Sequence, residues 1–448
     1  MTNRSIPDSH NSYYLETYGC QMNFAESNAI EQVLMQAGMK PAASAEQADC
    51  VIINTCSVRK TAENRIWGRI GFFKHVKETH PLTLVIVGCM AERIGEQLLK
   101  DAPAVDLVLG TNDKQRIAAI LSGASIDSDE HYSFTESYYK PGEIRSYVPI
   151  MNGCNNFCAY CIVPYVRGRE VSRSVESIVE EIDRLESLGV RDITLLGQNV
   201  NSYHYIQKGI NYRFPELLDT IVAHCSAIRW IRFDSPHPKD FSSDLVSVIA
   251  RYEQIAKHFH IPMQSGSTRI LNLMNRKYDR QRYLDLIESI RNACTDATFT
   301  TDVMVGFPGE TRDDFEETLS VMQSVRFLEA FMYYFNPREG TKAVTMEDQV
   351  PAKTRMDRLA ELIACQRTIT QQEKQARCHR IVDVLVEGPS KRSLRQYLGR
   401  TEHDEMVVFE KTQSTEPGEL IKVELQGLKG NTYTATIVAE AGSNACSD

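Results

Sequence analysis

Short apolar runs alternate with amphipathic helical patterns from Tyr13 to about Ser122. The runs with strand character are Tyr13–Tyr18, Cys50–Ile53, Leu82–Val87 and Asp106–Leu109. Helical spacing of apolar residues lies between them, over Glu26–Ala37, Thr61–Lys77 and Glu92–Leu99. Strand–helix alternation of this kind predicts a parallel sheet covered by helices on both faces.

A second alternation begins at Ser146, after a Ser-, Asp- and Tyr-rich stretch from Gly123 to Pro141 that we interpret as a linker. Its strands are predicted at Tyr147–Met151, Asp192–Leu196, Ile228–Phe233, His260–Met263, Phe299–Val305 and Ala330–Tyr334. Helical stretches such as Val175–Leu188 and Arg282–Cys294 lie between them. Six successive strand–helix units predict an open or partial (β/α)6 barrel.

The pattern changes again after a polar helical stretch at Met356–Ala376. Short alternating strands follow at Val382–Val386, Met406–Phe409, Leu420–Leu425 and Thr432–Ile437, which predicts a small all-β barrel. We therefore expect an N-terminal parallel α/β domain at 13–128, the partial barrel at 140–372 and the C-terminal barrel at 376–440.

Composition places the chain among ordinary soluble proteins, with 42% hydrophobic and 24% charged residues. No stretch approaches the ~20 apolar residues of a membrane helix, and Met1–Ser12 lacks the apolar core of a secretory signal. We expect a cytoplasmic protein without a membrane partner, in a compartment where thiols stay reduced. The twelve cysteines then point to metal ligands rather than disulfides. The net charge of −9 means that any nucleic-acid site must be a local cluster of cations.

Three cysteines, Cys154, Cys158 and Cys161, follow the first strand of the predicted partial barrel with CxxxCxxC spacing. Three thiolates on one loop can bind three irons of a [4Fe–4S] cube and leave the fourth iron open. A zinc site would be the competing interpretation, but zinc favours four protein ligands and no fourth cysteine or histidine stands nearby.

This spacing resembles the radical S-adenosylmethionine superfamily. The resemblance implies that the cofactor chelates the open iron and is cleaved to a 5′-deoxyadenosyl radical. Polar or glycine-rich segments at the predicted strand ends are candidates to bind it, because ligands of such barrels bind at the carboxyl ends of the strands. We expect S-adenosylmethionine to contact Tyr160, Gly197, Gln198, Asn199, Gln264, Ser265, Asp302 and Gly306.

A second set of cysteines is dispersed in sequence but shares one position in the predicted sheet. Cys20, Cys56 and Cys89 each lie just past the end of a predicted parallel strand, the edge where open α/β sheets bind ligands. Each alone could be a buried structural cysteine, as Cys50 at the start of a strand is expected to be. Together they predict three thiols that converge on one point.

The motifs around both triplets resemble the radical S-adenosylmethionine methylthiotransferase family over nearly the whole chain. The matching stretches are Tyr18–Asn23, Asn54–Arg59, Val87–Arg93, Cys161–Glu170, Gly197–Tyr203 and Thr301–Thr311. The resemblance implies two [4Fe–4S] clusters: a radical cluster on Cys154, Cys158 and Cys161, and an auxiliary cluster on Cys20, Cys56 and Cys89. One S-adenosylmethionine would methylate sulfur held at the auxiliary cluster and a second would generate the radical.

The C-terminal segment resembles the TRAM domain, an RNA-binding β-barrel, through Val384–Arg392 and Leu398–Thr401. Lys391, Arg392, Arg395 and Arg400 gather in this region and are expected to bind phosphates. Tyr397 is a candidate to stack on a base, although the whole cluster could equally form a solvated loop.

The family resemblance implies adenosine 37 of the tRNA anticodon stem-loop as the substrate. The closest similarity is to the MiaB branch, which converts N6-isopentenyl (dimethylallyl) adenosine to its 2-methylthio derivative. Ile162, Val163, Phe307 and Phe335 favour this apolar group, but Arg167 and Arg232 could bind the carboxylate of threonylcarbamoyl-adenosine instead. Two further hypotheses are an enzyme that modifies an aspartate of a ribosomal protein and a non-catalytic iron–sulfur protein that binds RNA. We expect a monomer that receives electrons from a donor such as flavodoxin or ferredoxin.

Overall fold

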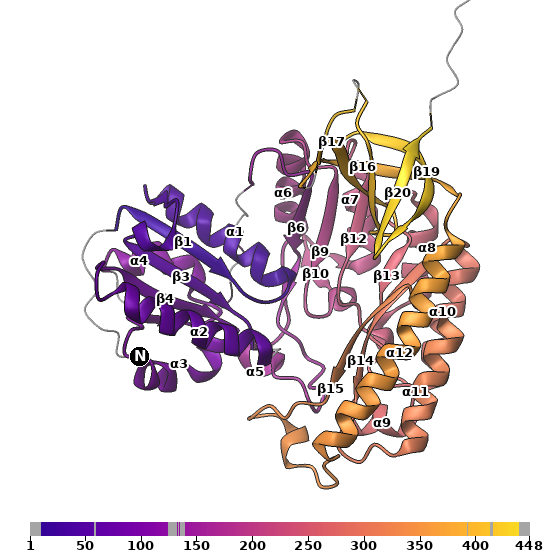
Figure 1. Cartoon of the computed structure of the whole chain (residues 1–448), viewed down its shortest axis with the longest axis horizontal. Helices are drawn as coiled ribbons and strands as arrows, with labels where there is room; N and C mark the ends of the chain where they lie inside the picture. Colours follow the sequence, from indigo (N-terminus) through magenta and orange to yellow (C-terminus); the bar gives the residue numbers. More distant parts are fainter. Residues whose placement is uncertain are drawn as a thin grey trace, which may run out of the picture.

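The computed structural model describes residues 10–57, 60–123, 132, 134, 139–391, 393–412 and 415–438. Figure 1 shows an N-terminal α/β unit, a curved central array of strands backed by helices, and a C-terminal β-barrel above that array. This is the predicted fold class. Most of the predicted linker lies outside the described residues. No helix in the described part of the chain is both long and apolar enough to cross a membrane.

The N-terminal unit is a five-stranded parallel sheet in the order β2-β1-β3-β4-β5. Its strands are β1 (Ser12–Thr17), β2 (Lys40–Pro41), β3 (Cys50–Thr55), β4 (Thr83–Gly88) and β5 (Leu107–Leu109). Helices α1 (Gln21–Gln36) and α4 (Ile117–Leu121) cover one face, and α2 (Lys60–Val76) and α3 (Cys89–Asp101) cover the other. β3 and β4 are buried along their whole length, so their sequences are continuously apolar rather than alternating.

Two helices of this unit begin earlier than predicted. The apolar spacing predicts starts at Glu26 and Glu92, whereas α1 begins at Gln21 and α3 begins at Cys89 itself. The first turn of α3 buries Met90 and Ala91 in the core of the sheet, whereas the first turn of α1 buries Met22 and Ala25 against Leu196 of the central unit. Cys20 and Cys89 consequently both stand at a helix start.

The central unit contains six parallel strands, as predicted. They are β6 (Arg145–Pro149), β9 (Asp192–Leu196), β12 (Trp230–Phe233), β13 (His258–His260), β14 (Thr298–Val305) and β15 (Glu329–Tyr334). Two three-stranded sheets, β12-β9-β6 and β13-β14-β15, are joined by a parallel bridge between Ile231 and Ile255. The helices outside are α6 (Val175–Ser187), α7 (Phe214–His224), α8 (Ser243–Arg251), α10 (Arg280–Ala293), α11 (Arg312–Val325) and α12 (Ala352–Ala376).

One predicted strand of this unit is shifted. The apolar pattern predicts His260–Met263, but β13 ends at His260. Pro262 lacks the N–H that would continue the ladder. The backbone amides of Ile261 and Gln264 still donate to carbonyls of β14, and the amide of Met263 donates to the Thr301 hydroxyl instead. The short hairpin of β10 (His204–Gln207) and β11 (Ile210–Arg213) is an addition that the sequence pattern does not predict.

The C-terminal strands close into a five-stranded barrel. They are β16 (Ile381–Ser390), β17 (Ser393–Thr401), β18 (Met406–Glu410), β19 (Leu420–Lys429) and β20 (Thr432–Ile437). The apolar pattern does not reveal β17 because its sequence is mostly polar. Tyr397 on β17 is 6% exposed and belongs to the barrel core, so its predicted role as a stacking residue is wrong.

The turn after β17, Thr401–Glu405, closes the amino-terminal end of the partial barrel. Arg232 of β12 donates to the carbonyls of Thr401 and Glu402, at 3.2 and 2.6 Å. Arg145, the first residue of β6, forms an ion pair with Asp404 at 2.9 Å. The open end of the barrel is therefore the carboxyl end, and Arg232 lies away from it, paired with Asp192.

Candidate functional site

The first cysteine triplet lies at one edge of the N-terminal sheet. Cys20 follows β1 and caps α1, Cys56 follows β3, and Cys89 follows β4. Thr55 and Gly88 are directly paired in the sheet, so Cys56 and Cys89 leave neighbouring strands side by side. The strand order reverses between β1 and β3, and such a switch point is where open α/β sheets bind ligands.

Two glycines allow the three cysteine segments to come together. A Cβ on Gly19 would lie 2.7 Å from the Cβ of Cys56, and a Cβ on Gly88 would lie 2.5 Å from the carbonyl oxygen of Thr55. Both glycines have positive φ, a conformation that other residues rarely adopt. The close approach of Cys20 to Cys56 and of Cys56 to Cys89 thus depends on glycine.

Asn23 is buried next to this triplet and links three of its neighbouring segments by hydrogen bonds. Its position in the sequence motif did not indicate this role. Its side-chain amide donates to the Thr55 carbonyl at 2.9 Å, and its Oδ1 accepts from the Cys20 thiol at 3.3 Å. Asn54 in turn donates to the Asn23 carbonyl at 2.9 Å. These bonds fix the start of α1 against the end of β3.

The second triplet lies on the loop that follows β6 and β7 (Met151–Asn152), at the carboxyl end of the partial barrel. Cys154 and Cys158 are buried, and the amide of Cys161 donates to the Cys158 carbonyl at 2.9 Å. Gln198, after β9, accepts a 2.6 Å hydrogen bond from the Gly153 amide. Gln198, a predicted cofactor residue, therefore fixes the start of the loop that carries the second triplet.

Arg276 is a functional candidate that no sequence motif indicated. Its guanidinium is buried, and Nη1 lies 3.4 Å from the Cys158 sulfur while Nε donates to the Tyr278 hydroxyl at 3.1 Å. The guanidinium therefore places a buried positive charge directly beside a sulfur of the predicted iron-binding loop. Burial meanwhile raises the pKa of the Cys161 thiol to about 12 and raises the pKa of Cys154.

The donor sets fit the clusters that the sequence implies. All six triplet cysteines are free thiols. Among the described residues, no three His, Cys, Asp or Glu side chains converge closely enough to share one metal ion. A cube takes one thiol per iron, so its ligands need not converge on a single atom.

The predicted cofactor segment after β9 and the segment after β12 each contain a buried polar atom that has no hydrogen-bond partner. Asn199 donates to Asp240 at 2.9 Å, but its Oδ1 is buried without a hydrogen bond. Nε2 of His237, which follows β12, is likewise buried and unpaired. Buried polar atoms are rarely left unsatisfied, so these two fit a site that a polar ligand completes. Gly197 lies two residues before Asn199 on the same segment. Tyr160, another predicted cofactor residue, packs edge-on against Phe307.

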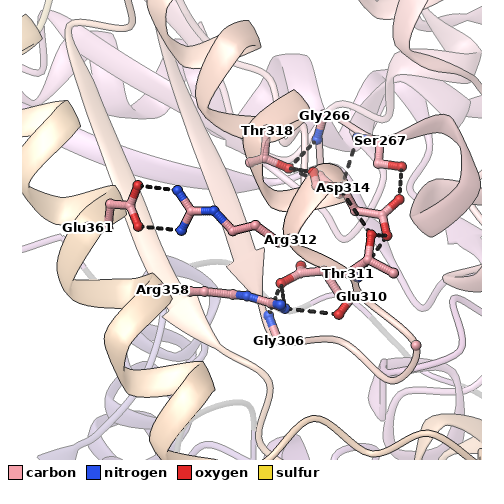
Figure 2. A network of polar contacts seen from close by, with 12 residues as sticks. Gly266, Ser267, Gly306, Glu310, Thr311, Arg312, Asp314, Thr318, Arg358 and Glu361 are labelled. Carbon is pink, nitrogen blue, oxygen red and sulfur yellow. Dashed lines mark hydrogen bonds and ion pairs between the residues drawn. The ribbon is translucent and has the colours of Figure 1, made fainter.

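The remaining predicted cofactor residues are held by α11 and its neighbours. The Gly306 amide donates to Glu310 at 2.8 Å, and Arg358 donates to the same carboxylate at 2.6 Å (Figure 2). Ser265 is buried, with its hydroxyl 3.3 Å from Thr318 of α11. Gln264 has a positive φ, and its backbone N–H donates to the backbone carbonyl of Asp302 at 2.8 Å. Gly266 and Gly306 contact other protein segments closely, because a Cβ on Gly266 would lie 2.6 Å from the Thr318 backbone and a Cβ on Gly306 would lie 2.2 Å from Cγ of Arg355.

Asp302 faces the inside of the partial barrel, where it pairs with His260 at 3.3 Å. Burial would lower the pKa of His260, but the hydrogen bond to Asp302 and the charges of Asp302 and Asp234 raise it. The predicted contact residue is therefore half of an ion pair in the barrel interior.

A buried trio of charges joins the two cysteine-bearing units. Glu26 of α1 accepts from Arg167 at 2.7 Å and also bonds to Lys114, and all three side chains are buried. Burial would raise the pKa of the Glu26 carboxyl, but Arg167 and Lys114 lower it to about 2. Arg167 also donates to Asn152 at 3.0 Å, two residues before Cys154.

An apolar contact accompanies these ion pairs. Cys89 packs against Ile162 and Val166, which follow Cys161 on the short helix α5 (Val163–Val166) and its start. Residues adjacent to the two triplets therefore touch directly. The two thiol sets therefore border one interface between the N-terminal and central units.

Replacing Glu26 by Gln tests this interface without any cofactor. The change leaves Lys114 and Arg167 buried without their carboxylate, which should lower the stability of the folded protein by about 3–5 kcal/mol. The free energy of opening of the β3 and β4 amides, measured by hydrogen exchange, should fall by that amount. Asp357→Asn, which breaks the exposed Lys353–Asp357 pair, is the control and should cost less than about 1 kcal/mol. Equal effects of the two substitutions would show that the trio does not stabilise the interface.

Comparisons with known proteins agree with this architecture. Residues 148–322 match the radical SAM superfamily, and residues 12–110 match the uncharacterized protein family UPF0004. Among solved structures, the radical S-adenosylmethionine methyltransferase TsrM from Kitasatospora setae is similar with a TM-score of 0.56. It is 13% identical, over 75% of this chain and 74% of that chain, which shows the fold alone.

Similarity to curated proteins extends over almost the whole chain. The tRNA-2-methylthio-N(6)-dimethylallyladenosine synthase of Treponema pallidum (strain Nichols) is 42% identical over 96% of this chain and 99% of its own length. The protein of the same name from Porphyromonas gingivalis (strain ATCC BAA-308 / W83) is 39% identical, over 95% of this chain and 94% of its own. The chain therefore belongs to the tRNA-2-methylthio-N(6)-dimethylallyladenosine synthase family of radical S-adenosylmethionine enzymes.

Proposed function

We propose that this chain adds a methylthio group to C2 of N6-isopentenyl (dimethylallyl) adenosine at position 37 of tRNA. S-adenosylmethionine serves as both methyl donor and radical source. The observation that carries the proposal is the pair of cysteine triplets at two facing sheet edges, in direct contact through Cys89 and Ile162. Two separate thiol sets suit a reaction that needs both a radical and a sulfur to be delivered to one base.

In this proposal Cys154, Cys158 and Cys161 hold the radical cluster, and Cys20, Cys56 and Cys89 hold the auxiliary cluster. When bound, the two clusters supply the electron for S-adenosylmethionine cleavage and the sulfur for transfer. The protein's own residues position the two thiol sets and exclude water from the space between them. We also keep the eight predicted cofactor residues as contacts of S-adenosylmethionine; the unpaired Asn199 Oδ1 and the Gln198 bond to Gly153 support this placement best.

The three domain boundaries given above are part of the same proposal, with the TRAM-like barrel as an RNA-binding module. We further propose a cytoplasmic monomer that is reduced by flavodoxin or ferredoxin. Free thiols at both triplets suit a reducing compartment.

The arginine pairings favour the isopentenyl group over threonylcarbamoyl. Arg167 is paired with Glu26, and Arg232 with Asp192 at the far end of the barrel, so both cations considered for a carboxylate are already engaged. Phe307 and Phe335 are buried against each other beside Tyr160. A threonylcarbamoyl carboxylate buried without a cation would cost several kcal/mol.

Replacing one triplet at a time by alanine separates the two chemistries. Without Cys154, Cys158 and Cys161 the protein should form no 5′-deoxyadenosine, because the radical source is lost. Without Cys20, Cys56 and Cys89 it should still form 5′-deoxyadenosine but no methylthio nucleoside, as measured by mass spectrometry of the products. Methylthiolated RNA from the second variant would show that those thiols are only structural.

Substrate identity is tested by competition between two anticodon stem-loops that differ only in the modification of adenosine 37. We expect methylthiolation of the isopentenyl RNA alone, because Arg167 and Arg232, the two cations considered for a carboxylate, are already paired with Glu26 and Asp192. Preferential turnover of the threonylcarbamoyl RNA would contradict the substrate while leaving the two-cluster chemistry in place.

For the C-terminal barrel, the predicted phosphate contacts divide into different environments. Lys391 and Arg395 are exposed, Arg392 lies outside the described residues, and Arg400 is engaged with Glu387 and Asp404 at 2.8 and 3.1 Å. Lys391 and Arg395 are consequently the better candidates to bind phosphate.

Charge reversal of Lys391 and Arg395 should weaken RNA binding and reduce the slope of log K against log salt by about one unit per lost contact. Fluorescence anisotropy over a range of salt concentrations measures this slope. Lys422→Glu, on the same barrel but within an exposed pair with Asp383, is the control. An unchanged slope in the double variant would place the phosphate contacts elsewhere.

A further inference from the structure

An exposed group of aromatic and cationic side chains borders the radical triplet. We call Phe157, Tyr165, Arg169 and Lys277 the aromatic rim. Tyr165 is 56% exposed, and its ring meets that of Phe157 edge-on at 5.8 Å. The Arg169 guanidinium lies over the Phe157 ring at 4.5 Å. The rim therefore combines exposed π-surface with positive charge next to Cys158 and Cys161.

The fourth member, Lys277, is linked to the same loop through one asparagine. Its ammonium donates to Oδ1 of Asn275 at 2.6 Å, while the Asn275 amide donates to the Phe157 carbonyl at 2.9 Å. Two cations thus flank Phe157. The nearby carboxylate of Glu170 accepts hydrogen bonds from the backbone and side-chain amides of Asn155 at 3.1 and 3.2 Å, so one negative charge also lies close to the rim.

The backbone of the rim is strained in a way that core packing does not explain. Phe157 has a φ of +47°, a left-handed conformation that is unfavourable for an aromatic residue. Such strain costs about 1–3 kcal/mol and gathers at functional sites. Phe157 is only partly buried and its ring contacts the exposed Tyr165. The strained backbone of Phe157 therefore serves to place an aromatic ring at the surface and not in the core.

We propose that the aromatic rim stacks the anticodon-loop nucleotides adjacent to the adenosine that enters the site. This rests on the proposed function, because the target base must leave its stack to reach the space between the two thiol sets. Its neighbours then lose a stacking partner, and the rings of Tyr165 and Phe157 are available close to Cys158 and Cys161. Arg169 and Lys277 add phosphate contacts, and aromatic rings with arginine are the common platform for single-stranded RNA.

The stacking and the charged members of the aromatic rim should respond differently to salt. Loss of a stacking ring removes affinity without removing a phosphate contact, so it should leave the salt dependence unchanged. Loss of Lys277 should do the opposite and lower the salt slope by about one unit. One variant that lacks the Tyr165 ring and one that lacks the Lys277 ammonium therefore distinguish stacking contacts from phosphate contacts within the rim.

The test is binding of an isopentenyl-containing anticodon stem-loop to the full-length protein, followed by fluorescence anisotropy. Tyr165→Ala should raise Kd roughly ten-fold, within the range for one stacked base, and Tyr165→Phe should bind like the original protein. Arg251→Ala removes a comparable arginine that lies over Tyr252 on the outer surface, and it should not change Kd. Iron content and thermal unfolding verify that each variant is folded.

A second probe reports stacking directly. With 2-aminopurine beside the modified adenosine, the original protein should quench its fluorescence on binding and Tyr165→Ala should not. Equal binding and equal quenching by Tyr165→Ala would overturn the inference, while binding and methylthiolation by the original protein would leave the proposed function intact. If Tyr165→Ala instead slows reduction by flavodoxin and leaves RNA binding unchanged, the rim docks a protein and the RNA inference is wrong.

Discussion

The buried contact between Glu26, Lys114 and Arg167 is the constraint on which the arrangement of this site depends. Glu26 lies on the helix that starts at Cys20, and Arg167 belongs to the segment that follows Cys161. A buried ion pair tolerates little displacement, because separation of its members leaves charges in a poorly solvated environment. The position of one thiol set therefore fixes the position of the other, although the partners are 141 residues apart in sequence.

Each side of that contact is organised by glycines and hydrogen bonds close to its own cysteine triplet. On the N-terminal side, Gly19 and Gly88 let strands end close enough for three thiols to share an edge, and Asn23 ties the start of α1 to β3. On the barrel side, Gln198 bonds to Gly153 and Arg276 contacts Cys158, so both residues hold the loop that carries the radical triplet. The opposite end of the barrel is closed by the Thr401–Glu405 turn, so access is confined to the end where the thiols lie.

Much of the fold was predictable because its signals are local. The N-terminal sheet, the six barrel strands and the C-terminal barrel each follow from apolar periodicity, and the two cysteine triplets follow from strand ends and motif spacing. β17 and the Tyr397 side chain were misjudged because a polar strand in a closed barrel has too weak an alternation to reveal its inner face.

The features missed at the site share a different physical origin. Arg276, Lys114 and Glu26 act through partners more than 80 residues away, and no spacing rule encodes a tertiary ion pair. Arg400 was predicted from the local cluster of cations as an RNA contact, whereas its pairing with Glu387 and Asp404 depends on how β16 and β17 pair within the C-terminal barrel. Sequence identified which residue types were available, but only the fold determined which charges remain free.

The central claim is that two separate thiol triplets each hold their own iron–sulfur cluster. The most direct measurement is the iron and labile-sulfide content of the anaerobically reconstituted protein, with Mössbauer spectra, for the original chain and for two variants that each lack one triplet. We predict about eight irons in the original chain and about four in each variant, from two independent four-iron cubes. A variant that retains eight irons, or one triplet whose removal empties both sites, would contradict the account.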